Sequence, residues 1–166
     1  MPLKSMILRF ILGVLPIIPA LGAVPSVAAT AWTQSGGEGV VLDCTAGTPD
    51  LAAIRARVSV SRGPEFGDRA CVAFFDADGS RFYRRLAVVS AFYPGQVSLE
   101  LYGLRSDGGW TELTPDPFEY DPDRDRLDVV RDRRVEMPTV HVSRGGSRVV
   151  FIFDPDQGLY WAVRAE

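Results

Sequence analysis

Four aspartates in a short acidic stretch are the residues whose spacing could hold a metal ion. They are Asp121, Asp123, Asp125 and Asp128. Calcium takes about six to eight oxygen ligands, which several carboxylates on one loop can supply. A helical calcium loop needs glycine at its sixth position and a bidentate glutamate at its last, and here Arg126 and Asp132 stand at those places. We therefore favour an exposed turn with local ion pairs, and a structural calcium ion is the alternative.

His141 is the only histidine, and Ser143 lies two residues further on. Histidine is the side chain whose ordinary pKa lies nearest neutrality, so a hydrolase using His141 or a pair of acids is conceivable. No G-x-S-x-G motif is present in the sequence. His141 alternates with Val140 and Val142, which predicts that its side chain faces solvent. We favour a surface histidine and assign no catalytic residue.

Two aromatic residues are candidates for ligand binding. Tyr102 lies on the polar face of an alternating run, opposite Leu99 and Leu101. Trp110 directly follows the turn residues Asp107 to Gly109, a position that predicts exposure. Exposed aromatic rings can stack on sugars or anchor a protein partner. We favour packing of both rings against a second sheet or a loop, and ligand binding is the alternative.

Cys44 and Cys71 are the only cysteines. An even count in an exported chain favours a disulfide, and two cysteines with one histidine are too few for a structural zinc site. A catalytic dithiol usually has C-x-x-C spacing, which is absent here. The sequence therefore predicts one structural Cys44–Cys71 disulfide.

The first 31 residues have the order of a secretory signal peptide. Lys4 and Arg9 precede an uncharged apolar run, and small residues around Ala29 and Ala31 follow it. This order is typical of bacterial exported proteins. We expect residues 1–31 to be removed as a signal peptide, with retention as a membrane anchor as the alternative. The predicted location is the periplasm or the outside of the cell, with no transmembrane helix after cleavage.

Composition and charge exclude several classes of protein. Hydrophobic residues make up 46% of the chain and charged residues 23%, which is typical of a globular protein. The formal net charge is −3, and loss of Lys4 and Arg9 with the signal peptide makes it −5. No basic stripe with interleaved aromatic residues is present, so the sequence indicates no nucleic-acid partner.

The dominant hydrophobic period in residues 32–166 is two. Val97, Leu99 and Leu101 alternate with polar residues, and similar runs include Val58–Val60, 127–129, 140–142 and 159–163. Asp-Gly and Gly-Gly pairs separate several of these runs, as in hairpin turns. Thr48, Pro49 and Asp50 resemble a helix start, so we expect one helix of two turns near residues 49–56, ending before Val58.

The sequence thus predicts one all-β domain over residues 32–166. We expect an antiparallel β-sandwich with about eight to ten strands, one short helix and one disulfide, and a barrel is the alternative. No motif combines a nucleophile, a base and an oxyanion site. The favoured function is therefore an exported non-catalytic binding module that uses a sheet face or hairpin loops to bind a protein or glycan of the cell envelope or outside the cell. A carbohydrate-binding module with a structural calcium ion and a small secreted hydrolase are the alternatives.

Overall fold

A computed structural model describes residues 39–45, 47–93, 95–132 and 134–165. The predicted signal peptide, residues 1–31, lies outside these ranges. Within them the chain forms two helices and nine strands. The helices are α1 (Pro49–Arg62) and α2 (Pro64–Gly67). The strands are β1 (Cys71–Asp76), β2 (Arg85–Tyr93), β3 (Gln96–Leu104), β4 (Trp110–Glu112), β5 (Phe118–Glu119), β6 (Arg126–Val130), β7 (Thr139–Arg144), β8 (Ser147–Asp154) and β9 (Leu159–Ala165).

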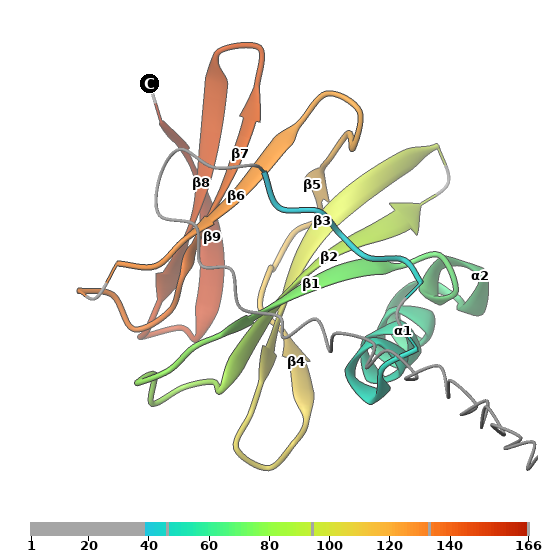
Figure 1. The fold of residues 1–166 in the computed structure, drawn as a ribbon, viewed down its shortest axis with the longest axis horizontal. Helices are drawn as coiled ribbons and strands as arrows, with labels where there is room; N and C mark the ends of the chain where they lie inside the picture. The colour runs from blue at the N-terminus through green and yellow to red at the C-terminus, as the bar shows by residue number, and fades with distance from the viewer. Residues whose placement is uncertain (1–38, 46, 94, 133, 166) are drawn as a thin grey trace, which may run out of the picture.

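The strands form two antiparallel sheets. Sheet A has the order β1-β2-β3-β4, and β5 pairs with the first half of β3 while β4 pairs with its last residues. Sheet B has the order β6-β7-β8-β9. Figure 1 shows sheet B on one side of sheet A and α1 on the other, so that the molecule has three layers. The sheets do not close into a barrel. The predicted antiparallel sandwich is confirmed, with a helix layer added to it.

The main core lies between the two sheets. Leu86, Val88, Leu99 and Leu101 of sheet A face Leu127, Val140 and Phe151 of sheet B, and all are buried. Gly79, Gly95, Gly108 and Gly145 have positive φ in the connections where the sequence predicts turns. Period two therefore predicted strands β3, β6, β7 and β9, and turn chemistry predicted several of the connections between strands.

Helix α1 is longer than the sequence analysis predicted. It spans Pro49–Arg62 instead of ending before Val58, so the strand predicted at Val58–Val60 is wrong. Leu51, Ile54 and Val58 recur at helical spacing and are all buried against sheet A. The Thr48 hydroxyl caps the first turn by accepting from the Leu51 N–H, as predicted. A helical stripe of three apolar residues outweighed the local alternation of valine with polar residues.

The Cys44–Cys71 disulfide is present and anchors the segment before α1 to the start of β1. Asp43 and Val72 exchange two backbone hydrogen bonds of 2.9 Å beside it. The Val40 N–H donates to the Leu127 carbonyl of β6, so the same segment also contacts sheet B. The disulfide therefore closes the chain segment that contains α1 and ties the start of this segment to sheet A.

Candidate functional site

Three of the four aspartates of the acidic stretch, Asp121, Asp125 and Asp128, contact cations or backbone N–H groups of the protein itself. Asp125 is buried and receives two hydrogen bonds from Arg144, at 2.5 and 2.7 Å, and one from the Asp121 N–H. Burial alone raises the pKa of Asp125, but these hydrogen bonds outweigh burial and hold the pKa below its ordinary value. Asp128 pairs with Arg126 at 3.2 Å.

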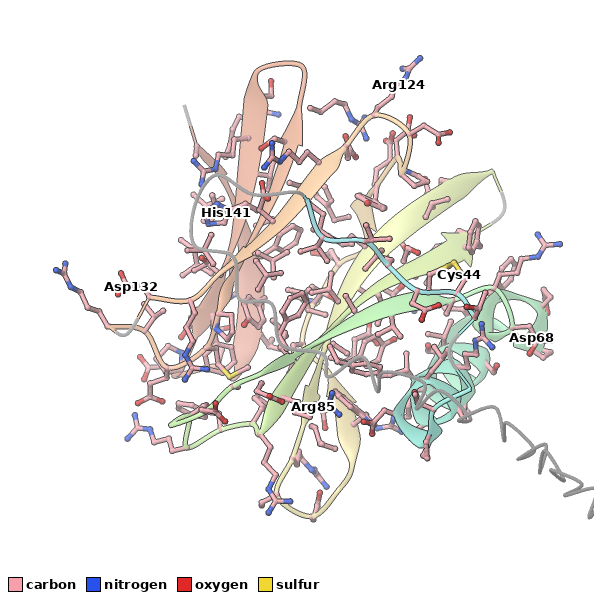
Figure 2. All side chains as sticks on the ribbon, viewed as in Figure 1. Cys44, Asp68, Arg85, Arg124, Asp132 and His141 are labelled. Atoms are coloured by element: carbon pink, nitrogen blue, oxygen red, sulfur yellow. A yellow bond between two sulfur atoms is a disulfide. The ribbon has the colours of Figure 1, made fainter. Side chains whose placement is uncertain are left out.

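The remaining two aspartates of the stretch lie in the turn itself. Asp121 Oδ1 accepts from the Asp123 N–H, and Asp121 also pairs at 3.6 Å with Arg124, which projects from the loop (Figure 2). Within the described ranges, no three His, Cys, Asp or Glu side chains are grouped so that they could hold a metal ion. The local geometry is that of the turn with ion pairs that the sequence analysis favoured, and calcium binding stays an untested alternative.

His141 lies on the side of sheet B that faces away from sheet A (Figure 2). Arg148 donates a hydrogen bond to His141 Nδ1, and because guanidinium nitrogens only donate, the ring proton must be on Nε2. Nε2 lies 3.1 Å from the Thr139 hydroxyl, which in turn donates to the Val130 carbonyl. Both ring nitrogens are thus engaged, which leaves neither to take a proton from Ser143.

The pKa of His141 is lowered from its ordinary value. Burial contributes most, the Arg148 guanidinium adds to it, and the Asp128 carboxylate opposes both. His141 is therefore a neutral, half-buried part of the outer surface of sheet B. Its neutral form is the one that accepts from Arg148.

Tyr102 and Trp110 are buried, which agrees with the packing interpretation and not with exposure for ligand binding. Their exposed fractions are 1% and 5%, and both pack with Leu51, Ile54 and Val58 under α1. The sheet face that carries them points away from the main core, as alternation predicted, but α1 covers it. Neither ring face is available at the surface to stack on a ligand.

The sequence analysis missed a buried polar cluster centred on Glu100. This carboxylate has no exposed surface. Oε2 accepts from the Tyr102 hydroxyl at 2.8 Å, and Oε1 accepts from the Tyr93 hydroxyl at 2.9 Å and from Arg62 Nε at 3.3 Å. The second partner of Arg62 is Glu112, which its Nη2 contacts at 3.0 Å. The cluster ties the last residue of α1 to β2, β3 and β4.

The electrostatics of this cluster are those of a structural network. Burial raises the pKa of Glu112, the neighbouring Glu100 carboxylate adds to that rise, and Arg62 opposes it. Burial likewise raises the pKa values of Tyr93 and Tyr102, so both hydroxyls stay protonated donors. Two glutamates that share an arginine could suggest acid chemistry, but Glu100 is enclosed by its donors and has no surface from which to reach a substrate. The cluster holds α1 in place.

The outer face of β8 and β9 carries the largest exposed apolar side chains of the sheets. Ile152 is 44% exposed, Trp161 40% and Val163 48%. The register pairs Ile152 with Trp161 and Val150 with Val163, so these four side chains form one cluster, called here the β8–β9 patch. Arg148 and Asp154 lie at its two ends. Contiguous apolar patches on the surface of a protein are often binding sites.

The sequence contains a signal for this patch. Leu159, Trp161 and Val163 share one face of a strand, and alternation alone suggests that this face is buried in the core. In the structure it is Tyr160, on the opposite face, that enters the core, where its hydroxyl donates to the Pro138 carbonyl at 2.6 Å. On β9 only Tyr160 is therefore buried, and Trp161 and Val163 on the opposite face are exposed.

The helices of the described part of the chain include none long and apolar enough to cross a membrane. No protein-family model matches the chain, and no curated protein or solved structure is significantly similar to it.

Proposed function

We propose that this chain is an exported, non-catalytic interaction module that binds a protein through the β8–β9 patch. The observation that carries the proposal is the exposure of Ile152, Trp161 and Val163 together on one sheet face. Tryptophan and arginine are the residues most enriched at the energetic centres of protein interfaces, and Arg148 borders this cluster. A central apolar cluster with charged ends is the usual anatomy of a binding surface.

A protein is favoured over a glycan as the partner. Trp161 is the only ring of the β8–β9 patch, and its neighbours Ile152, Val150 and Val163 are aliphatic side chains without hydrogen-bonding groups. Sugar hydroxyls need such groups when they lose water, whereas the apolar side chains of a protein do not. The patch therefore fits a protein surface with apolar side chains at its centre and charges of both signs at its rim.

Export is supported by two features. The first 31 residues have the order of a signal peptide, and the Cys44–Cys71 disulfide is typical of an oxidising compartment. Mass spectrometry of the protein from producing cells tests this part of the proposal. We expect a chain that begins after Ala31, or after Ala28 or Ala29, with both cysteines oxidised. A full-length chain with free thiols in the cytoplasm would contradict export.

Photo-crosslinking tests the binding surface. A photoreactive amino acid at Val163 should give discrete protein adducts in producing cells, since this residue lies in the β8–β9 patch. The matched control is Val60, an exposed valine on α1 that is distant from the patch. Adducts from Val163 and none from Val60 would support the proposal. No adduct from Val163, or the same adducts from both positions, would refute it.

A further inference from the structure

The outward side chains of β8 have a self-complementary order. Along the outer face the strand presents Arg148, Val150, Ile152 and Asp154, a cation and an anion with two aliphatic residues between them. Val149, Phe151 and Phe153 point the other way, into the main core. A second copy of this strand, laid over the first in the opposite direction, would bring Arg148 of each copy to Asp154 of the other.

The neighbouring strand β9 has a matching order of sizes. The register pairs Arg148 with Ala165, Val150 with Val163, Ile152 with Trp161 and Asp154 with Leu159. In the same reversed arrangement, Val163 of each copy faces Trp161 of the other, and Ala165 faces Leu159. Each large side chain thus lies opposite a smaller one, which is the condition for two apolar surfaces to interdigitate.

We propose that the partner of the β8–β9 patch is a second copy of this chain, packed face to face with the first. This inference rests on the proposed function, because it names the occupant of the same surface. The two-fold axis lies in the interface, perpendicular to the strands, above the central pair Phe151 and Ala162. The interface is isologous, as in most homodimers, and holds two Arg148–Asp154 pairs.

The geometry of packed sheets permits these pairs. Two sheets packed face to face keep their strands within about 30° of each other, so residues about 10 Å from the axis are offset by about 5 Å. The long side chain of Arg148 can cover that distance. Arg148 uses one nitrogen for His141 within its own copy, and guanidinium has further N–H donors for the second copy.

The net charge of the chain disfavours non-specific association of two copies. Each copy carries a formal charge of −5 after loss of residues 1–31, so two copies repel one another at long range. Contact between the patches has to overcome this repulsion through apolar burial and the two charge pairs. We therefore expect a weak dimer, because the like net charges oppose association, and salt screens both this repulsion and the two charge pairs.

Sedimentation of the mature, oxidised protein up to about 200 µM, a range in which weak dimers form, tests the proposal. We expect a monomer–dimer equilibrium. Arg148→Asp or Asp154→Arg alone should weaken the dimer about tenfold or more, since each places like charges opposite one another twice. The double variant should dimerise again, and an equimolar mixture of the two single variants should form heterodimers visible by native mass spectrometry.

Folding controls keep this test decisive. Asp154 Oδ1 accepts from the N–H groups of Asp156 and Gln157, so Asp154→Arg could disturb the β8–β9 turn. Asp154→Asn keeps an acceptor oxygen there while removing the charge, and it too should weaken the dimer. Arg164→Asp is the matched control, because Arg164 shares the other face of β9 with Tyr160 and should leave the dimer unchanged.

The outcomes separate this inference from the proposed function. A monomer at all concentrations, or single variants that neither weaken the dimer nor pair with each other, would overturn the self-association. If photo-crosslinks from Val163 then join a different protein, the binding surface stands and only its occupant is wrong. If Val163 gives no adduct at all, the proposed function fails as well.

Discussion

Replacement of Arg62 by methionine removes the guanidinium that faces the buried Glu100. Methionine keeps most of the apolar length of the side chain, so the main change is the loss of the positive charge. Loss of one partner of a buried ion pair costs about 3–5 kcal/mol. Arg62 is 22% exposed, and the hydroxyls of Tyr93 and Tyr102 still donate to Glu100, so we expect a smaller cost, about 2–3 kcal/mol.

Urea denaturation of the oxidised, mature protein measures this loss. The pair Arg81–Glu136 provides a matched control, because it has the same chemistry at 3.2 Å but side chains that are 74% and 41% exposed. Arg81→Met should cost less than about 0.5 kcal/mol, as surface ion pairs do. The structure predicts a difference between two arginines that the sequence does not distinguish.

A second substitution tests the reason for the loss. In the Arg62→Met background, Glu100→Gln removes the uncompensated buried charge but keeps the shape and an acceptor oxygen. We therefore expect the double variant to be more stable than Arg62→Met alone. A double variant that is less stable than Arg62→Met, or an Arg62→Met variant as stable as the parent, would show that Glu100 is not held as a buried charge.

Three further predictions concern stability. Replacement of Cys44 and Cys71 by alanine should lower the free energy of unfolding by about 3 kcal/mol, measured by denaturation, with no further loss on adding reductant. The pKa of His141 in the folded protein lies below its unfolded value of 6.5, so the unfolded chain takes up a proton first, and stability should fall as the pH drops from about 7 through 6.5. His141→Gln should reduce this dependence of the unfolding free energy on pH. An unchanged dependence would exclude His141 as its source. Calcium or chelator should leave the melting temperature unchanged, because Arg144 already binds Asp125, and a rise with calcium would favour the metal site.

The sheets were predictable because their signals are local. Val97, Leu99 and Leu101 alternate within one strand, and glycines with positive φ stand between strands where turns were expected. Helix α1 was underestimated because Val58 and Val60 alternate with polar residues, although Val58 also continues the helical stripe of Leu51. Only packing against sheet A decides between the two periods.

The features of the candidate site that the sequence did not decide have one physical origin. Tyr102 was placed on the correct face of β3, but whether that face meets water depends on α1, which is distant in sequence. Glu100 was missed for the same reason, since its cation Arg62 lies 38 residues away. Conversely, the apolar face of Trp161 suggests a core position, and its exposure follows only from Tyr160 occupying the core. One sequence supplies the alternation of faces but does not determine which layer covers each face.

The oxidation rate of Trp161 tests most directly whether the β8–β9 patch is a binding surface. Hydroxyl-radical footprinting with mass spectrometry should be run on the mature protein across a concentration series, and again with native cell-envelope extract. Trp110 is the internal reference, because it is buried at 5% exposure. We predict that Trp161 is readily oxidised in dilute protein and becomes protected as the protein concentration rises. Oxidation of Trp161 at the same rate in dilute protein, concentrated protein and envelope extract would contradict the assignment of this face as a binding surface.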